Sequence, residues 1–181
     1  MFVRNAWYVA GYSSELVAGQ RMARRFLDEP VVIFRTASGK ISALMDRCSH
    51  RAYPLSEGLV DGEILRCAYH GVEFAPSGDC THIPGQTRIP PSACVRAYPV
   101  VEKDEFIWIW MGEPDKADPA KILDNAEHRD PAWHWKPFYM HVKANWQLLI
   151  DNILDLTHVA YIHAKTIGGN PQTHFNAEVE V

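Results

Sequence analysis

Residues 45–74 read MDRCSHRAYPLSEGLVDGEILRCAYHGVEF, and the pattern of this stretch governs the architecture that we expect. It holds two pairs of metal-binding residue types, Cys48 with His50 and Cys67 with His70, and sixteen residues separate the pairs. Each pair follows a short apolar stretch and precedes turn residues, so we expect each pair at the tip of a hairpin. Two such tips can hold a metal site between them.

The sequence on both sides of this stretch shows further short strands divided by turns. Residues 31–34 and 41–45 flank Ser38-Gly39 and predict a hairpin. Other strands are expected at 63–66, 71–74 and 105–111. In the last of these, aromatic residues alternate with isoleucines, which is typical of a central strand that is apolar on both faces. Many short strands divided by glycine and proline predict a mainly β domain, a small antiparallel sandwich or barrel.

Composition narrows the class of protein. The 181 residues allow one large domain or two small ones, and 47% apolar with 22% charged residues is ordinary for a globular chain. A net charge of −4 argues against a nucleic-acid partner or a polybasic membrane patch. Without an apolar run of about 18 residues or a signal-like N-terminus, we expect no membrane association and a cytoplasmic location. Four cysteines are too few for a disulfide scaffold, which favours metal ligation.

The pattern changes after Met111. Residues 112–119 are polar and rich in turn formers, so we place a linker there and a domain boundary near residue 112. Residues 138–144 predict a strand. Apolar residues at helical spacing predict a continuous helix over 145–161.

Four side chains of this helical region form a second group of possible ligands. On a helix, Asp151, Asp155 and His158 share one face. His163 lies about 140° further round, so it can join His158 on one ion only if the helix ends or loosens between them. The alternative is that the two histidines are ordinary core residues and that the two aspartates cap the helix or face solvent. Because these four residues follow the two Cys-His pairs in the same chain, we favour a metal site.

The first two pairs leave three interpretations open: a structural zinc, a [2Fe-2S] cluster, or a coincidence of turn residues. Zinc sites usually pair like ligands, as C-x(2–4)-C followed by H-x(3–5)-H. Here each pair mixes one Cys with one His. That mixture suits a cluster in which two thiolates hold one iron and two imidazoles hold the other.

The segments CSHRAYPLSEG (48–58) and CAYHGVEF (67–74) resemble the two ligand loops of the Rieske iron-sulfur family. The resemblance implies that Cys48 and Cys67 bind one iron and that His50 and His70 bind the other. Neutral imidazoles in place of two thiolates raise the potential of such a cluster.

The same loops also indicate a branch of the family. Respiratory-type members carry an additional, disulfide-bonded cysteine in each loop, and neither loop has one here. Cys80 and Cys94 lie outside the loops and are expected to be ordinary thiols. Because the additional cysteines are missing, the resemblance is to the oxygenase or ferredoxin branch. One departure from that branch is Ser49, which stands where many oxygenase relatives have proline.

The segment DNILDLTHVAYIH (151–163) resembles the mononuclear iron site of Rieske non-haem iron oxygenases. This implies that His158 and His163 are two ligands of a 2-His-1-carboxylate Fe(II) site with open positions for O₂. Asp155 then resembles the catalytic carboxylate that orients a ligand histidine and bridges to His70 of a neighbouring subunit, which implies a head-to-tail homotrimer. The fold implied is a Rieske domain, residues 1–112, followed by the truncated start of an α+β catalytic domain, residues 113–181.

The third iron ligand is not evident in the sequence. Glu178 and Glu180 are the only acidic residues after His163, and an alternating strand explains them more simply. Asp151 lies about 10 Å from His158 along a helix axis, too far to bind the same ion. In the family this ligand is a carboxylate further downstream. We therefore expect a fragment of an oxygenase that is inactive alone.

Within the family, FVRNAWYVAG (2–11), CAYHGVEF and DNILDLTHVAYIHAKTIG (151–168) look most like the vanillate and dicamba O-demethylase group. The implied function is a terminal oxygenase that receives NAD(P)H electrons through a reductase or ferredoxin. Its implied reaction with O₂ is hydroxylation or O-demethylation of a small aromatic substrate. The alternative is a Rieske-type ferredoxin that only carries electrons, which residues 1–112 would serve equally well. A carrier has no use for Asp155, His158 and His163 as a second iron site. A zinc module, the third possibility, predicts a colourless protein.

Overall fold

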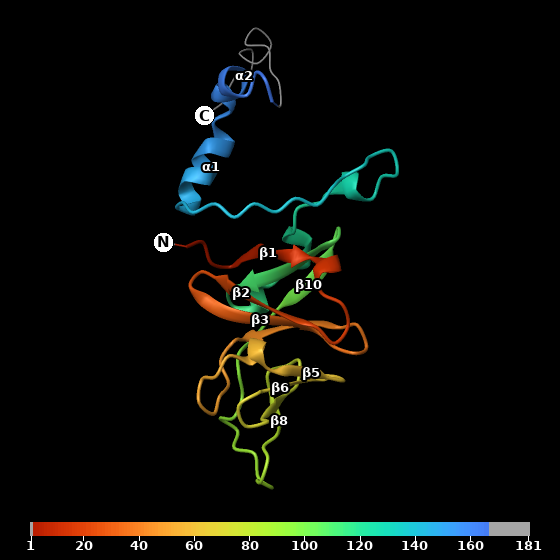
Figure 1. Cartoon of the computed structure of the whole chain (residues 1–181), viewed down its shortest axis with the longest axis vertical. Coiled ribbons are helices and arrows are strands. Elements are labelled where there is room, and N and C mark those ends of the chain that lie inside the picture. The colour runs from red at the N-terminus through yellow and green to blue at the C-terminus, as the bar shows by residue number, and fades with distance from the viewer. Residues whose placement is uncertain (1, 167–181) are drawn as a thin grey trace. The chain divides into compact units, whose positions relative to one another are not determined.

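The computed structural model describes residues 2–166, which form two compact units that meet in sequence between Pro137 and Phe138 (Figure 1). The units are described separately below. No helix within the described residues is long and apolar enough to cross a membrane.

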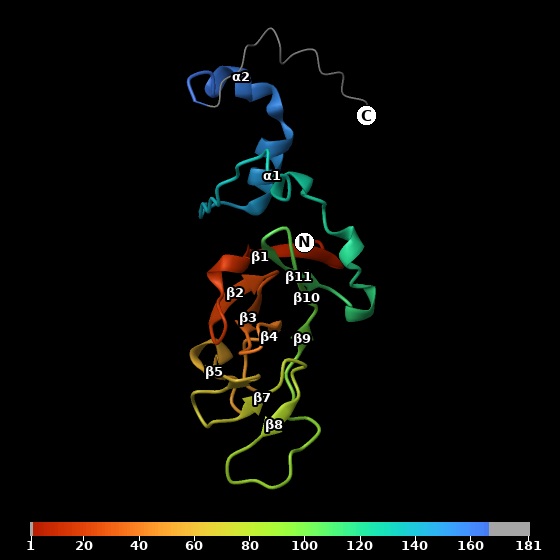
Figure 2. The ribbon, with the colours of Figure 1, turned by 90° about the vertical axis from the view of Figure 1, so that its right-hand side faces the viewer.

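The first unit contains three antiparallel sheets, which follow one another along the unit (Figure 2). The first sheet has the order β1 (Ala6–Tyr12), β11 (Phe106–Met111), β10 (Val100–Lys103). The second has the order β2 (Arg21–Phe26), β3 (Glu29–Arg35), β4 (Ile41–Met45), β9 (Ala97–Tyr98). The third has the order β5 (Leu59–Asp61), β6 (Ile64–Arg66), β7 (Glu73–Phe74), β8 (Cys80–His82). The predicted mainly β, antiparallel architecture is confirmed, as are the β3–β4 hairpin and the central position of β11.

Strand β3 lies at the centre of this unit because both of its faces are covered. Residues 31–34 are all fully buried. Val31 and Ile33 pack into one core with Ile107 of β11, whereas Val32 and Phe34 pack into another core with Leu65 of β6. Alternate side chains of a strand point to opposite faces, so a continuous apolar run is what a strand between two cores requires. Cys48 and Cys67 belong to the second core.

Residues 113–137 contain three short 3₁₀ turns, η3 (Pro114–Lys116), η4 (Pro119–Lys121) and η5 (Ala126–His128), and pack on the first unit. The indole of Trp7 donates to the Asp118 carbonyl (2.9 Å), and that of Trp110 donates to the Glu113 carbonyl (2.8 Å). The side chain of Ile122 is buried. The expected linker is thus held against the sheet, while a functional boundary at residue 112 stays a prediction.

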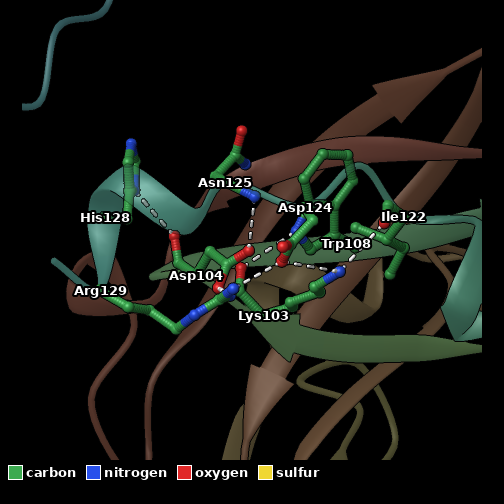
Figure 3. Close-up of polar contacts among 8 residues, drawn as sticks. All are labelled: Lys103, Asp104, Trp108, Ile122, Asp124, Asn125, His128 and Arg129. Carbon is green, nitrogen blue, oxygen red and sulfur yellow. Dashed lines mark hydrogen bonds and ion pairs between the residues drawn. The ribbon is translucent and has the colours of Figure 1, made fainter.

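The end of this segment is held by the turn between β10 and β11 (Figure 3). The Asp104 carboxylate accepts from the Asn125 backbone amide (3.1 Å) and forms an ion pair with Arg129. Arg129 also pairs with Asp124 (2.7 Å), and Lys103 donates to the Ile122 carbonyl (3.0 Å). Residues 122–129 are therefore fixed by several charged contacts.

In the second unit, the expected continuous helix over 145–161 is wrong. Helix α1 (Trp146–Leu154) ends at Asp155, whose backbone is extended at φ −94° and ψ 90°. A short turn, η6 (Leu156–His158), and helix α2 (Val159–Ile162) follow. The Asp155 carboxylate accepts from the Thr157 amide (3.1 Å) and hydroxyl (2.6 Å), a local bond that competes with helix continuation.

The strand expected at 138–144 is also absent from the described structure. A strand needs a second strand to satisfy its backbone donors and acceptors. Between residue 138 and residue 166 the structure contains only helices, turns and irregular backbone, so these described residues offer no second strand for this segment to pair with.

Candidate functional site: two Cys-His loops and a histidine pair

The first Cys-His loop, residues 47–56, begins after β4 and ends in the turn η2 (Leu55–Glu57). Its backbone closes on itself. The Cys48 amide donates to the Tyr53 carbonyl (2.9 Å), and the Ala52 amide donates to the Cys48 carbonyl (2.8 Å). Strands β4 and β5 on either side belong to different sheets, so this loop crosses between sheets rather than capping a single hairpin.

The second Cys-His loop, residues 67–72, is the tip of the β6–β7 hairpin, as expected. Its closure repeats that of the first loop at the same spacing. The Cys67 amide donates to the Val72 carbonyl (2.8 Å), and the Gly71 amide donates to the Cys67 carbonyl (3.0 Å). The two loops thus present a Cys at their start and a His beyond it on matching backbone frames.

The two thiols lie in the interior. The residues Cys48 and Cys67 are 4% and 2% exposed. Burial raises the pKa of the Cys48 thiol, and the neighbouring Cys67 side chain raises it further. Thiolates are the form that binds metal, so binding at this pair would release protons.

The two imidazoles, in contrast to the thiols, lie at the surface. His50 and His70 are both exposed, and their ring centroids are 4.6 Å apart. Desolvation lowers the pKa of His70, and the charges of His50 and Arg51 lower it further. A lowered pKa favours the neutral imidazole, which is the form that ligates a metal.

The two loops have equal geometry and hold one buried thiol pair and one exposed imidazole pair. This arrangement fits a group of two metal ions, one bound by thiolates and the other by imidazoles. A [2Fe-2S] cluster with mixed ligands has this requirement. All four side chains named from the sequence are brought to one place in the first unit, and their role as ligands remains a prediction.

Two side-chain features of this region were not found from the sequence. The buried Asp46 carboxylate accepts from the Ser56 amide (2.7 Å) and hydroxyl (2.6 Å), and this pins both ends of the first loop. The Tyr69 ring lies on the His70 ring with 3.8 Å between centroids, and Tyr53 contacts Tyr69 at 5.4 Å. The sequence does show a tyrosine close to each Cys-His pair, but it does not show that these rings contact one another or His70.

A cavity of about 560 Å³ opens beside the two imidazoles. Its far wall comes from residues 83–95, here called the proline loop, which joins β8 to β9. Ile83, Pro84 and Pro90 line it together with His50 and His70.

The second predicted site lies in the second unit. His158 and His163 flank α2 at its two ends, and their ring centroids are 5.5 Å apart. From the sequence, His158 and His163 can bind one ion only if the helix ends or loosens between them. The structure meets this condition, because the helical region breaks at Asp155 and α2 ends at His163. The Nδ1 atom of His158 lies 2.5 Å from the Asp155 carbonyl, which can only accept. The proton is therefore on Nδ1, which leaves Nε2 as the ring atom that can bind a metal.

The Asp155 carboxylate itself bonds to Thr157 within this unit. These two hydrogen bonds, with a smaller effect of the His158 charge, hold the pKa of Asp155 below its usual value. The bridge of this carboxylate to a histidine of a second copy stays a prediction. Because α1 ends at Leu154, the single helical face predicted for Asp151, Asp155 and His158 is wrong.

Between residues 2 and 166, no group of three or more His, Cys, Asp or Glu side chains is placed to hold one metal ion. His158 and His163 therefore stand as a pair in this part of the chain. Glu178 and Glu180, the acidic residues that follow them in sequence, lie outside the described residues.

Comparison with protein families gives two matches along the chain. Residues 6–99 match the Rieske [2Fe-2S] domain, which is just over half of the chain. Residues 142–181 match the vanillate O-demethylase oxygenase C-terminal domain. The first match contains both Cys-His loops, and the second contains the histidine pair.

Individual relatives agree with these matches. The chain is 45% identical to the iron-sulfur subunit of a toluene-4-sulfonate monooxygenase system from Comamonas testosteroni, over 99% of this chain and 52% of that protein. It is 46% identical to the oxygenase component of dicamba O-demethylase from Stenotrophomonas maltophilia, over 90% of this chain and 48% of that protein. The chain thus spans about half the length of the curated relatives that it matches.

A solved structure of dicamba monooxygenase bound to dicamba superposes with a TM-score of 0.84 at 45% identity, over 90% of this chain and 48% of that one. The family matches, the related sequences and the related structure agree with one another. The chain belongs to the Rieske [2Fe-2S] family, and the relatives named here are the iron-sulfur or oxygenase components of oxygenase systems.

Proposed function

We propose that this chain supplies the electron-transfer centre and two iron ligands of a terminal oxygenase. Cys48 and Cys67 would hold one iron of a [2Fe-2S] cluster, and His50 and His70 would hold the other. The observation that carries this proposal is the equal closure of the two loops, which hold a buried thiol pair and an exposed imidazole pair with ring centroids 4.6 Å apart. Residues 1–112 are the proposed cluster domain.

When bound, the cluster would pass single electrons and the mononuclear Fe(II) would activate O₂. The chain's own residues set the conditions for this chemistry. The second core keeps water from the two thiols, which protects them from oxidation. The imidazoles reach the surface, so electrons can enter and leave through them. The Asp46–Ser56 bonds hold the two ends of the first loop together.

The second unit would supply the iron ligands His158 and His163. The Asp155 carbonyl fixes the tautomer of His158, so that Nε2 is ready to bind. Asp155 has the proposed role of passing electrons to the iron from His70 of a neighbouring subunit in a homotrimer. Residues 113–181 would thus begin a catalytic domain, and a carboxylate would complete the iron site.

Relatives indicate the reaction class. Among them are a dicamba O-demethylase, a vanillate O-demethylase and a toluene-4-sulfonate monooxygenase. We therefore propose hydroxylation or O-demethylation of a small aromatic substrate in the cytoplasm, with electrons from NAD(P)H through a reductase or ferredoxin. The match of residues 142–181 to an oxygenase C-terminal domain favours this reaction over the ferredoxin carrier.

The test is reconstitution of the purified chain with iron and sulfide under anaerobic conditions. We expect two irons and two acid-labile sulfides per chain, a red-brown colour, and the electron spin resonance signal of a mixed-ligand cluster after reduction. Cys48→Ser and Cys67→Ser should abolish the signal, whereas the matched controls Cys80→Ser and Cys94→Ser should keep it. A chain that binds one zinc and no labile sulfide would contradict the proposal.

The iron pair is tested separately in a chain that also contains the downstream catalytic residues. His158→Ala and His163→Ala should abolish product formation and leave the cluster signal intact. Loss of the cluster signal in either variant would show that these histidines do not serve a second site.

A further inference from the structure

One face of the first sheet is built of indole rings. Trp108 and Trp110 are two residues apart on β11, and Trp7 of β1 pairs directly with Trp110. Alternate residues of a strand share a face, as do directly paired residues of neighbouring strands, so the three indoles lie on one side of the sheet. The other side belongs to the core that Ile107 and Ile109 share with β3. The rings of Trp7 and Trp110 are in contact, with 5.4 Å between centroids.

The N–H groups of these three indoles are already bonded. Those of Trp7 and Trp110 donate to backbone carbonyls of the segment after β11. The Trp108 indole donates to the Lys103 carbonyl at 3.2 Å, and the Lys103 ammonium in turn donates to the Ile122 carbonyl at 3.0 Å (Figure 3). The rings are therefore held in place, and they offer apolar surface rather than hydrogen-bond donors to a molecule that reaches them.

A cavity of about 360 Å³ lies against this indole face. The three indoles line it together with Lys121 and Leu123 of the segment after β11. Leu123 is 72% exposed although it is apolar. Small-molecule sites in proteins are concave, occupy about 300–1,000 Å³, and combine mainly apolar walls with a few polar groups that orient the ligand. The size and the lining of this cavity suit a ligand with a single ring.

Lys121 supplies the only charged side chain among the described residues that line the cavity. It is exposed and forms no ion pair with another described residue. Acidic groups of the same segment are paired elsewhere, Glu113 with Lys116 (2.8 Å) and Asp124 with Arg129 (2.7 Å). A negatively charged group on the ligand would therefore meet an ammonium without an ion-pair partner and no carboxylate in the wall.

We propose that this cavity binds a small aromatic anion, a single ring that carries a carboxylate. The ring would pack on the indoles, and the carboxylate would lie against the Lys121 ammonium. Tryptophan faces also attract organic cations, but the charge of Lys121 opposes a cation here. The lining contains no residue of the two Cys-His loops or of the histidine pair, so the site is distinct from both. This inference does not rest on the proposed function.

The first test compares three probes that share one ring and differ in charge: benzoate, benzyl alcohol and benzylammonium. Calorimetric titration of the purified chain at pH 7 measures each dissociation constant. We expect benzoate to bind about fivefold more tightly than benzyl alcohol, benzylammonium to bind most weakly, and the advantage of benzoate to shrink at high salt. Equal affinity for the three probes, or tightest binding of benzylammonium, would overturn the proposal.

Nuclear magnetic resonance locates the bound probe. The chain contains six tryptophans, and each gives one indole N–H signal. Benzoate should shift the signals of Trp7, Trp108 and Trp110 and leave the other three unchanged. Shifts confined to the other three tryptophans would place the ligand elsewhere and refute the site.

Variants separate the charge from the apolar wall. Lys121→Gln should reduce the affinity for benzoate to that for benzyl alcohol, whereas Lys40→Gln, the matched control at an exposed position outside the cavity, should not. Leu123→Ala should weaken both probes several-fold. Leu59→Ala, which also truncates an exposed leucine, should weaken neither. Equal effects of the two lysine variants would contradict the role of Lys121.

The final comparison uses a chain that also contains the downstream catalytic residues. Benzoate should shift the same three indole signals there. Loss of these shifts would show that a downstream segment fills the cavity, and self-association of the chain that benzoate reverses would assign the cavity to a second copy. Either result would overturn the proposal. No measurement in this series depends on labile sulfide or on turnover, so its failure is distinguishable from failure of the proposed function.

Discussion

Ala52 and Gly71 occupy equivalent positions in the two Cys-His loops, and only one of them is suited to its backbone. Both residues have positive φ, 54° for Ala52 and 72° for Gly71. An alanine in the left-handed region carries a penalty of roughly 1–2 kcal/mol that glycine does not. The first loop therefore stores strain at the residue that donates to the Cys48 carbonyl.

Exchanging these two residue types should have opposite effects. Ala52→Gly should raise the free energy of unfolding by about 0.5–1 kcal/mol, because strain relief exceeds the added chain entropy. Gly71→Ala should lower it by about 1–2 kcal/mol, since its Cβ would also lie 3.2 Å from Pro84 Cγ. Urea unfolding followed by circular dichroism measures both. Gly39→Ala, at φ 89° with open space around it, is the control for backbone strain without loop contacts. A neutral Gly71→Ala would contradict the argument.

Tyr69 is a positioning residue for His70, because their rings lie 3.8 Å apart. Tyr69→Ala should remove stacking worth about 0.5–1.5 kcal/mol and let the imidazole reorient. We expect a broader electron spin resonance line and a shifted reduction potential in the reconstituted cluster. Tyr69→Phe keeps the ring and should keep the parent line shape and potential. Identical spectra for the alanine and phenylalanine variants would exclude this role.

At the scale of elements, the sequence predicts strands best where both faces of the strand are buried. The run 31–34 and the hairpin to β4 follow from apolar pattern and turn residues, and the structure confirms them. The two-residue turn 104–105 has positive φ at both positions, a conformation that usually selects Asn-Gly. Here Asp and Glu occupy it, so turn chemistry alone does not reveal it.

The helical region shows the opposite case. Apolar spacing favours an unbroken helix, but α1 ends at Asp155, whose carboxylate accepts two local hydrogen bonds from Thr157. The candidate site was predictable because Cys and His recur at fixed spacing in two loops. Features that depend on contacts between loops, such as the cavity wall at Ile83 and the Tyr69 stack, leave no comparable pattern.

The ion pair between Arg35 of β3 and Glu102 of β10 links the second sheet to the first, at 2.6 Å. The Arg35 hydrogen bond holds the pKa of Glu102 below its usual value of 4.5, although burial opposes this. A carboxyl group with a lowered folded-state pKa adds stability above its unfolded pKa, and this is lost as the pH falls through the folded value. The free energy of unfolding should therefore decline below about pH 4.5.

Glu102→Gln should remove part of that decline and cost about 1 kcal/mol at pH 7, since the pair is partly exposed. Urea unfolding of both chains from pH 3 to pH 7 measures the difference. Parallel pH curves for the variant and the parent would show that this link does not contribute.

At the scale of the molecule, the first unit extends beyond the boundary suggested by composition. Trp7, Trp110 and Lys103 all donate to backbone carbonyls of residues 113–122, and Ile122 is buried. Polar and turn-rich composition marks a segment without regular structure, but it does not distinguish a free linker from a chain held by hydrogen bonds.

Two truncations test this extension. A chain that ends at Pro137 should unfold like the first unit of the parent chain. A chain that ends at Gly112 should lose about 2–4 kcal/mol, from the exposed site of Ile122 and two unpaired indole donors. Urea unfolding followed by tryptophan fluorescence measures both. Equal stability of the two truncations would place the structural boundary at residue 112.

The matched closure of the two Cys-His loops bears on how such motifs diverge and how they are found. Each loop is fixed by hydrogen bonds within itself, from Cys48 to Tyr53 and from Cys67 to Val72. The sixteen residues between the pairs include the β5–β6 turn, where an insertion would alter neither closure. Evolution can therefore lengthen that gap while the spacing inside each pair stays constant. A search pattern for distant homologues should fix C-x-H and C-x-x-H and leave the gap free.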